Sequence, residues 1–356
     1  MYVIPEAAFD ELSGRDGSVG VIILKRQQAL NALNLVMLSA ISQRLTEWEN
    51  AAHIKAVVIR AAEGRAFCAG GDIRAVYERR MMEDPALFEF FRDEYRLNYK
   101  VRCFRKPYIA LLDGITMGGG AGLSVHGSHR VATDRLLFAM PETGIGFYPD
   151  VGMSYVLSRL PHQMGFYLGL TGARLSRGDC EALGLVTHSV SEEAFPELMY
   201  TLADTSLNSD ARGTVSALLE RFSEVSGGSE LWEHREEIST CFAGKTVEEI
   251  LKALKAGSTW CKEVAEVICQ KSPTSLKITY QALKNAADLD FDACMEMEYA
   301  LTRHVLQGSD FFEGIRAVVI DRDQKPQWKP RTLREVTARM VAGYFAPMSP
   351  FLHEDH

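Results

Sequence analysis

Four glycines within residues 118–122 constrain the fold of this chain more than any other feature. They follow the apolar run of residues 108–112, which is typical of a buried strand. Glycine lets a backbone turn sharply and lets another group approach it closely. Beyond the glycines, two more apolar runs lead to a loop that carries the carboxylates of Glu142 and Asp150. This order predicts a site where backbone amides hold a negatively charged oxygen beside an acid or base.

The glycine cluster can also be compared with nucleotide-binding patterns. No Gly-Lys-Ser/Thr follows it, so it is not a P-loop. A Rossmann fingerprint needs Gly or Ala at its third position, where the two possible frames place Leu123 and Val125. Asp134, at the end of the next strand, keeps a nucleotide-binding oxidoreductase open as an alternative. We expect a helix from the glycines to His126, whose first amides suit a phosphate or an oxyanion equally well. Close packing of a helix on a strand would also select glycine.

Strands and helices alternate in the N-terminal part. Residues 19–24 and 54–59 are apolar runs typical of strands, and between them Asn34 can cap a helix with an apolar stripe. This order implies layers of sheet and helix. A glycine-rich break, GRAFCAGGDI, precedes the next helix. Asp72 is expected to cap that helix, and the amide of Gly71 can point into a pocket.

A carboxylate lies in the middle of an apolar helical face. Residues 85–104 are predicted to form a helix, and Glu94 shares one face of it with large apolar side chains. A buried carboxylate costs free energy unless it is paired or used. Because Arg92, Arg96 and Arg102 are near in sequence, a salt bridge is the expected explanation from the residues alone.

The loop PETGIGFYPDVG, residues 141–152, restricts its own conformation with two prolines and three glycines. Asp150 precedes a helix predicted over residues 154–160, so helix capping is its expected structural role. Glu142 has no such role, which favours it as an acid or base. The two histidines of HGSH, residues 126–129, have no neighbouring metal ligands, and we expect them to be structural.

Composition and charge exclude several classes of function. The net charge of −8 gives no reason to expect nucleic acid or an anionic membrane as a partner. The longest charge-free run, residues 114–129, is too short and too rich in glycine to span a bilayer. Seven scattered cysteines without a C-x-x-C pair predict free thiols. The acidic N-terminus resembles neither a signal nor a transit peptide, so a cytoplasmic location is expected, or a mitochondrial one if a transit peptide has been removed.

Composition also divides the chain into three parts. We expect a core of residues 1–204, a helical insert at residues 205–271 and a helical C-terminal region at residues 272–356. Pro273 occupies a plausible first turn of a helix. A last helix is predicted over residues 333–341.

Several segments together resemble the crotonase (enoyl-CoA hydratase/isomerase) superfamily. They are NALN at 31–34, RAFCAGGDI at 65–73, KPYIALLDGITMGGGAGLS at 106–124, FAMPETGIGFYPDVG at 138–152, LTGARLS at 170–176, SPTSLKIT at 272–279 and DFFEGIRAVVIDRDQKPQWKP at 310–330. The resemblance covers nearly the whole chain, and the motifs are far more specific jointly than singly. The segment FRDEYRLN, the KPQWKP motif and the helical insert are most similar to the 3-hydroxyisobutyryl-CoA hydrolase branch.

The resemblance implies an α/β fold, the crotonase (ClpP-like) fold of repeated ββα units with a helical C-terminal region. It also implies that two backbone amides hold a thioester carbonyl oxygen, and the motifs place these at Gly71 and Gly119. Hydratases of the superfamily carry a glutamate where this chain has Gly122. The hydrolase branch instead pairs Glu142 with Asp150.

In the hydrolase branch, the residue matching Glu94 is a further substrate contact, and this interpretation replaces the salt bridge. The implied function is hydrolysis of a short 3-hydroxyacyl-CoA, such as 3-hydroxyisobutyryl-CoA in valine degradation. No cofactor or metal is expected beyond the CoA of the substrate, and homo-oligomers are possible. A hydratase or isomerase on the same fold and a non-catalytic acyl-CoA-binding protein are the alternatives.

Overall fold

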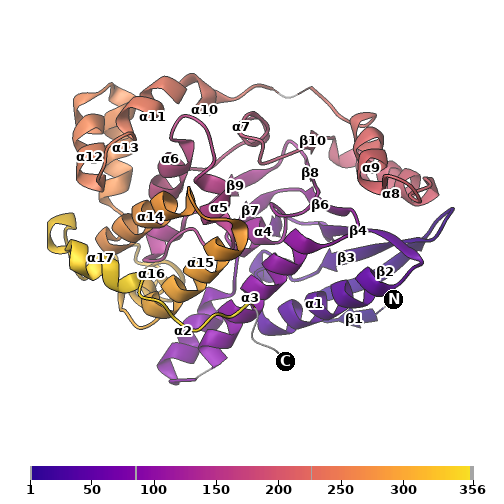
Figure 1. The fold of residues 1–356 in the computed structure, drawn as a ribbon, viewed down its shortest axis with the longest axis horizontal. Helices are drawn as coiled ribbons and strands as arrows, with labels where there is room; N and C mark the ends of the chain where they lie inside the picture. Colours follow the sequence, from indigo (N-terminus) through magenta and orange to yellow (C-terminus); the bar gives the residue numbers. More distant parts are fainter. Residues whose placement is uncertain (1, 85, 226, 353–356) are drawn as a thin grey trace. The chain divides into compact units, whose positions relative to one another are not determined.

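The computed structural model of the protein describes residues 2–84, 86–225 and 227–352 (Figure 1). The chain forms two compact units, and each is assembled from three separate stretches of sequence. The first unit contains Met1–Gly71, Arg96–Phe138 and Leu175–Glu230. The second contains Asp72–Tyr95, Ala139–Arg174 and Leu231–His356. The expected division after residues 204 and 271 follows composition along the chain and stays a prediction.

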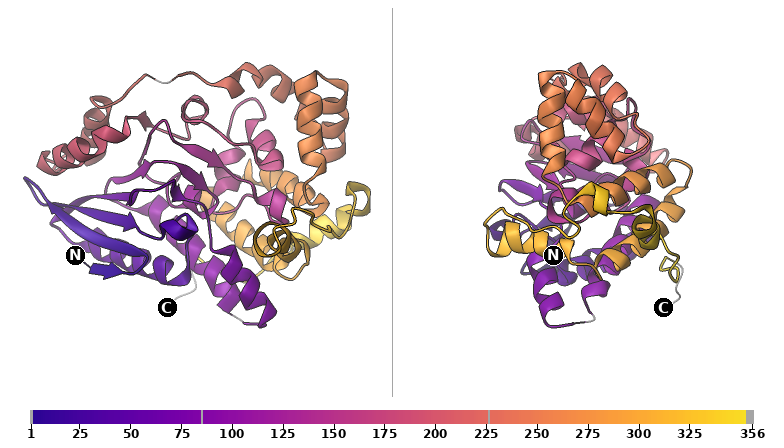
Figure 2. Two further views of the ribbon diagram at one scale, coloured as in Figure 1. Left: turned by 180° about the vertical axis from the view of Figure 1, so that it is seen from behind. Right: turned by 90° about the vertical axis from the view of Figure 1, so that its left-hand side faces the viewer.

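The first unit is built on a seven-stranded sheet with the strand order β1-β2-β3-β4-β6-β8-β10 (Figures 1 and 2). The first three strands pair antiparallel, and the sheet is parallel from β3 onward. The strands expected over residues 19–24, 54–59 and 108–112 are confirmed. The strands are β1 (Tyr2–Ile4), β2 (Ala7–Ser13), β3 (Ser18–Leu24), β4 (Ile54–Ala61), β6 (Tyr108–Leu112), β8 (His129–Ala132) and β10 (His188–Ser189).

Helices cover both faces of this sheet. On one face lies α1 (Leu35–Asn50), whose Trp48 packs on Gly20 and on the ring of Phe9. Asn34 caps α1 as expected, since its side chain accepts from the amide of Met37 at 2.9 Å. The other face packs against α8 (Phe195–Asp204) and α9 (Ala211–Glu220) in one buried cluster, which includes Val19, Val58, Ile109, Leu111, Val131, Leu198, Leu202, Val215 and Leu219. The predicted β/α layers are therefore confirmed.

A second, three-stranded sheet of order β5-β7-β9 carries the glycine cluster. Its strands are β5 (Ala66–Cys68), β7 (Ile115–Met117) and β9 (Leu137–Ala139), and β7 runs into the short helix α4 (Gly119–Gly122).

The helix expected to reach His126 is wrong in length, because it ends at Gly122. Ser124 explains the early end. Its hydroxyl donates to the carbonyl oxygen of Gly120 at 2.8 Å, and its amide bonds to the carbonyl oxygen of Ala121 at 3.0 Å. The bond from the Ser124 amide to Ala121 spans three residues and so interrupts the α-helical pattern at this position.

The second unit is mainly helical. Asp72 caps α2 (Ile73–Met81) as expected, with its side chain accepting from the amide of Ala75 at 3.1 Å. The helix predicted over residues 85–104 is confirmed as α3 (Ala86–Cys103), a helix that continues into the first unit, and Pro85 lies outside the described residues. Further helices of the second unit are η2 (Glu142–Ile145), α5 (Met153–Leu157), α6 (Met164–Thr171), α11 (Arg235–Cys241), α12 (Val247–Ala256), α13 (Thr259–Cys269), α14 (Pro273–Ala286), α15 (Phe291–Val305), α16 (Asp310–Ile315) and η4 (Arg316–Ile320).

Residues 205–271 contain helices and no strand in their described part, as their composition predicts. Short helices there and elsewhere include η1 (Gln27–Ala29), α7 (Arg177–Ala182), η3 (Glu192–Ala194) and α10 (Glu230–Glu233). Pro273 occupies the first turn of α14, as expected. No helix in the described part of the chain combines the length and the apolar character needed to cross a bilayer.

The last predicted helix, over residues 333–341, is divided in two. A short 3-10 turn, η5 (Leu333–Glu335), is followed by α17 (Ala338–Tyr344). Thr337 separates them because its side chain caps α17 by accepting from the amide of Met340 at 3.2 Å. A cap fixes where a helix begins, and apolar spacing alone does not detect it.

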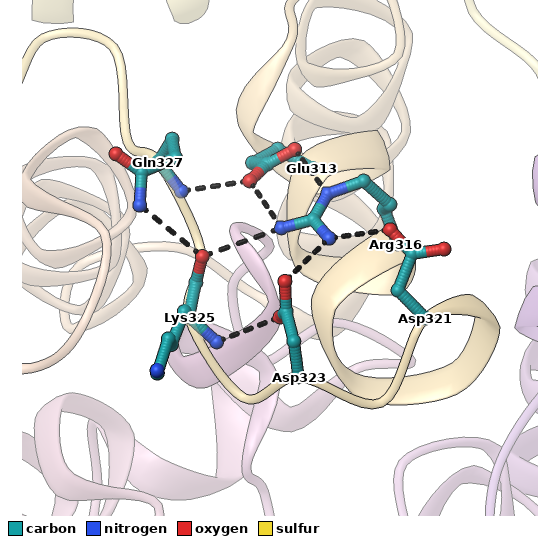
Figure 3. A network of polar contacts seen from close by, with 6 residues as sticks. All are labelled: Glu313, Arg316, Asp321, Asp323, Lys325 and Gln327. Carbon is teal, nitrogen blue, oxygen red and sulfur yellow. Dashed lines mark hydrogen bonds and ion pairs between the residues drawn. The ribbon is translucent and has the colours of Figure 1, made fainter.

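A single arginine organises the segment that follows α16 (Figure 3). Arg316 pairs with both carboxylate oxygens of Glu313, each at 2.9 Å. Its Nη1 atom also contacts Asp321 at 2.6 Å and Asp323 at 2.8 Å. Glu313 in turn accepts from the amide of Gln327 at 2.7 Å. These bonds hold residues 321–327 in one irregular conformation.

Candidate active site

The two glycine segments of the first unit lie side by side because their strands are parallel neighbours. β5 pairs with β7, with Ala66 opposite Ile115, so the segments that follow both strands leave the same edge of the sheet. The backbones are close there: a Cβ atom on Gly70 would lie 3.7 Å from the amide nitrogen of Gly119. The structure therefore places the Gly71 segment beside Gly119 within this unit, as the motif assignment requires.

Neither the amide of Gly71 nor that of Gly119 has a hydrogen-bond acceptor within the described chain. The first segment is fixed by its neighbour instead, since the carbonyl oxygen of Gly70 accepts from the amide of Leu33 at 2.8 Å. Unpaired amides are rare inside proteins and need an explanation. A bound oxygen atom would supply one. Because α4 is only one turn long, its dipole contributes little to binding a negatively charged oxygen. The two unpaired amides would supply most of the attraction.

Only glycine fits at the start of α4. A Cβ atom on Gly120 would lie 2.2 Å from the carbonyl oxygen of Cys68, far inside a van der Waals contact. Helix α4 therefore packs directly on the end of β5. This contact confirms the close-packing role of the cluster.

The three carboxyl groups that the sequence singled out are all buried in the second unit: Glu94 on α3, Glu142 on η2 and Asp150 in the following loop. Their exposed fractions are 3%, 6% and 5%. The charge of Asp150 raises the pKa of both glutamates, and the charge of Glu94 also raises the pKa of Glu142. The structure thus gathers the three carboxyl groups that the sequence singled out.

Glu94 forms no ion pair with the described residues, so the salt bridge expected from its arginine neighbours is wrong. Arg92 pairs with the adjacent Asp93 at 3.2 Å instead. The Oε1 atom of Glu94 has no hydrogen-bond partner in the described chain. Burial, and then the charge of Asp150, raise the pKa of Glu94 well above its usual range. A contact to a substrate stays a prediction for this residue.

Glu142 begins the 3-10 turn η2 immediately after Pro141. Its Oε2 atom is buried and has no hydrogen-bond partner in the described chain. Burial, and then the charge of Asp150, raise the pKa of this carboxyl group well above its usual range. A buried carboxyl with a raised pKa and a free oxygen is suited to take or give a proton near neutral pH.

Asp150 does not cap the following helix, so that expectation is wrong. Helix α5 begins at Met153, and the carboxylate that caps it belongs to Glu298 on α15. Oε2 of Glu298 accepts from the amide of Gly152 at 2.7 Å, and Oε1 accepts from the amide of Ser154 at 2.9 Å. The Ser154 hydroxyl also donates to Oε1.

The turn that carries Asp150 is conformationally strained. Val151 has a φ angle of +55°, a left-handed conformation that a β-branched residue rarely adopts. Such a turn persists only where its surroundings hold it. Glu298 supplies that hold through the amides on either side of Met153. Burial raises the pKa of Glu298 to about 8, against these bonds, which favour its ionised form.

Tyr95 is the direct partner of Asp150. Its hydroxyl oxygen lies 2.7 Å from Oδ2 of Asp150 and 2.6 Å from the hydroxyl of Thr302 on α15. Burial raises the pKa of Asp150 to about 7, and the hydrogen bond to Tyr95 opposes that rise. The hydroxyl of Tyr148 also contacts the hydroxyl of Thr302, at 2.7 Å, so it is linked to Asp150 through Thr302 and Tyr95.

Sequence reasoning missed Tyr95, Tyr148, Glu298 and Thr302. Glu94 was noticed as a carboxylate on an apolar helical face, and the same pattern marks Glu298. It shares its face of α15 with the buried side chains of Cys294, Leu301 and Val305. The two tyrosines gave no such signal, because a tyrosine on an apolar face is ordinary core.

His129 of HGSH has a structural role, as expected. His129 is hydrogen bonded to the hydroxyls of Ser128 at 2.9 Å and Ser216 at 3.0 Å. Burial lowers its pKa to about 4, so it is neutral at physiological pH. No group of three or more His, Cys, Asp or Glu in the described residues has the arrangement of a metal site.

The sequence pattern of one protein family, enoyl-CoA hydratase/isomerase, matches residues 19–345. The chain belongs to that family. Among its curated relatives, the mitochondrial 3-hydroxyisobutyryl-CoA hydrolase of Xenopus laevis is 44% identical over 93% of this chain and 87% of that protein. The human mitochondrial 3-hydroxyisobutyryl-CoA hydrolase is 43% identical over 96% of this chain and 89% of that protein.

Solved structures of the family share the fold. A carnitinyl-CoA dehydratase from Mycobacterium thermoresistibile has a TM-score of 0.89 and 36% identity, covering 98% of this chain and 99% of that one. An enoyl-CoA hydratase from Rhodobacter sphaeroides has a TM-score of 0.87 and 34% identity, covering 97% and 98%. The α/β fold expected from the resemblance is confirmed.

Proposed function

We propose that this member of the family is an acyl-CoA thioester hydrolase that converts 3-hydroxyisobutyryl-CoA to the free hydroxy acid and CoA, as in valine degradation. The names of the curated relatives support this activity over nearly the whole chain. The observation that carries it is the buried carboxyl group of Glu142, which keeps a free oxygen beside Asp150 and Glu94. A thioester hydrolase needs such a group to activate water or to attack the carbonyl.

The amides of Gly71 and Gly119 are proposed to stabilise the oxyanion of the tetrahedral intermediate. Their unpaired state and the glycine backbone around them support this role. Removing one such donor typically costs on the order of 100-fold or more in turnover. No metal or cofactor takes part in this scheme beyond the CoA of the substrate.

Glu142 has two possible routes. As a general base it removes a proton from water, and as a nucleophile it attacks the thioester carbonyl and forms an anhydride. Single-turnover hydrolysis in ¹⁸O-labelled water separates them. Label found in Glu142 supports the anhydride, whereas label confined to the product acid supports the general base.

Asp150 and Glu94 are proposed to form the polar end of the acyl pocket. Asp150 orients the substrate hydroxyl or the water and assists proton transfer, and Glu94 contacts the substrate hydroxyl. A methyl group changes discrimination by only ~1–3 kcal/mol. Short relatives such as 3-hydroxypropionyl-CoA therefore belong in the substrate panel.

The named hydratase and dehydratase structures make hydration the second candidate. It is disfavoured by Gly122, the buried last residue of α4, which provides no carboxylate where the superfamily's hydratases carry a glutamate. Incubation with crotonyl-CoA, followed at the enoyl absorbance, tests it. Loss of absorbance without thiol release would make the chain a hydratase.

The deciding experiment is a thiol-release assay over short acyl-CoAs, with Glu142→Ala as the control. We expect release from 3-hydroxyisobutyryl-CoA by the natural chain and none by the variant. Release that survives in Glu142→Ala would support a non-catalytic, acyl-CoA-binding role with a contaminating hydrolase. No release from any hydroxyacyl-CoA would refute the hydrolase proposal.

Location and assembly remain proposals. The curated relatives are named mitochondrial, so a mitochondrial location stands beside the cytoplasmic one expected from the N-terminal residues. Fractionation of cells that carry the tagged full-length protein distinguishes the two. Sedimentation of the purified chain tests for a homo-oligomer.

A further inference from the structure

The hydroxyl groups beside Asp150 form one unbranched chain of short oxygen–oxygen contacts. It runs from Oδ2 of Asp150 to Tyr95 at 2.7 Å, from Tyr95 to Thr302 at 2.6 Å and from Thr302 to Tyr148 at 2.7 Å. It ends where the Tyr148 hydroxyl meets the backbone carbonyl of Glu298. At these distances each pair of oxygens needs a proton between them.

The protons available can be counted. The row of hydrogen-bonded oxygens has four contacts, and Tyr95, Thr302 and Tyr148 each bring one hydroxyl proton to it. The carbonyl of Glu298 brings none. When Asp150 is ionised, one contact is left with two facing lone pairs. When Asp150 is protonated, every contact is filled, and each hydroxyl donates to the next until Tyr148 donates to the carbonyl.

The negative charges of the neighbouring carboxyl groups also favour the protonated form of Asp150. Glu94 and Tyr95 face Asp150 from α3, Glu142 and Tyr148 come from its own loop, and Glu298 comes from α15. Buried carboxyl groups this close are not all ionised together at neutral pH.

Of Glu94, Glu142 and Asp150, Asp150 is the one for which the described residues provide a hydroxyl that can accept its proton. A proton on Oε1 of Glu94 or on Oε2 of Glu142 would find no partner in the described chain, whereas a proton on Oδ2 of Asp150 finds Tyr95. Burial separately raises the pKa of Asp150 to about 7.

We propose that Asp150 rests protonated and enters the reaction as an acid that protonates the departing sulfur of CoA. This inference rests on the proposed hydrolase function. On the general-base route, Glu142 takes one proton from water, and the water oxygen bonds to the carbonyl carbon. The carbon–sulfur bond then breaks, sulfur keeps the electron pair, and the proton of Asp150 moves to it. The products are the free acid and the thiol, and Asp150 regains a proton when Glu142 gives one up.

Replacing Thr302 tests the proton count. In Thr302→Val, the row of hydrogen-bonded oxygens divides into two separate contacts, Tyr95–Asp150 and Tyr148–Glu298. One hydroxyl proton fills each contact while Asp150 is ionised. The ionised form is then no longer penalised, and the pKa of Asp150 is expected to fall by about one unit. The measurement is the carboxyl ¹³C shift of aspartate-labelled protein over pH, assigned with Asp150→Asn. If Thr302 merely strengthened Tyr95 as a donor, the pKa would rise instead.

Thr279→Val is the matched control. Thr279 is a buried threonine on α14 whose hydroxyl has no partner in the described chain, so this change is expected to leave the titration of Asp150 unaltered. Tyr148→Phe is the second variant, should Thr302→Val fold poorly. It leaves two contacts for two hydroxyl protons with Asp150 ionised, and the pKa is again expected to fall.

The kinetic counterpart is the alkaline limb of the pH–rate profile. If Asp150 is the acid, activity is lost as pH rises through its pKa, and Thr302→Val moves that limb to lower pH by the same amount. An unchanged or raised pKa in both variants overturns the inference. A natural chain that releases no thiol overturns the hydrolase proposal instead, and the ¹³C titration still decides the proton count.

Discussion

At the scale of single residues, the buried carboxyl group of Glu142 is proposed to serve catalysis while it lowers the stability of the fold. A buried carboxyl group without a full set of partners destabilises the fold once it ionises. A chain would have no structural reason to keep it there, which is the physical basis for treating it as functional.

We predict that Glu142→Gln abolishes measurable thiol release yet stabilises the protein. The folded pKa of Glu142 is raised, so the folded state holds its proton more tightly, and the natural chain loses stability as pH rises from the unfolded value upward. Glutamine does not titrate, so the gain in thermal midpoint is expected to be larger at pH 8 than at pH 5. Calorimetry at both values checks it. Glu89→Gln, at an exposed position on helix α3, is expected to change neither quantity.

Residue types pointed to the proposed functional positions unevenly. The glycine segments and Glu142 stood out because glycine clusters and a carboxylate without a structural role are rare, and the family motifs then assigned Gly71 and Gly119 within those segments. Asp150 and Glu94 were given the wrong structural explanation from local sequence, since a cap or an ion pair depends on which side chains arrive from elsewhere. The real cap of α5 lies at Glu298, which is 144 residues away in sequence from Ser154.

At the scale of elements, the strands were the easiest to predict and the helix ends the hardest. Apolar runs located β3, β4 and β6, because parallel strands are buried on both faces. The ends of α4 and α17 depended on the hydroxyls of Ser124 and Thr337, which compete with or cap the backbone and leave no periodic pattern.

We predict that Glu298→Ala destabilises the protein by about 3 kcal/mol, because two amides and one hydroxyl lose their buried acceptor. Urea denaturation measures the loss. Asp290→Ala is the matched variant, since Asp290 caps the same helix α15 at an exposed site, and about 1 kcal/mol is expected there. Equal losses in the two variants would mean that Glu298 does not hold the strained turn.

We predict that Gly120→Ala lowers stability by about 2 kcal/mol or more, because the new methyl group collides with the carbonyl of Cys68. Gly343→Ala is the control. Gly343 lies inside α17 with no atom within 4 Å of an added Cβ, so alanine is expected to be neutral or to stabilise by up to about 1 kcal/mol. Thermal midpoints of the two variants should therefore move in different directions or by clearly different amounts.

At the scale of the whole molecule, all seven cysteines are free, as their spacing predicts. Cys103 and Cys269 are exposed and the other five are buried. We predict that a thiol reagent such as Ellman's reagent reacts quickly with two groups in the native protein and with seven after denaturation. A thermal midpoint that shifts on adding reductant would contradict the absence of disulfides.

The discontinuous build of the two units has a consequence for the order of events during synthesis. The first unit takes its last residues from the stretch that ends at Glu230, so a ribosome has released all of its parts while the second is still incomplete. Glu94, Glu142 and Asp150 leave the ribosome early, but α15, which brings Glu298 and Thr302, follows only at Phe291–Val305. Until α15 is made, its side chains cannot contact the turn, and we expect the carboxyl groups to be solvated and ionised. The acid–base character of the cluster therefore appears late, when α15 folds against a turn that was made more than a hundred residues before it.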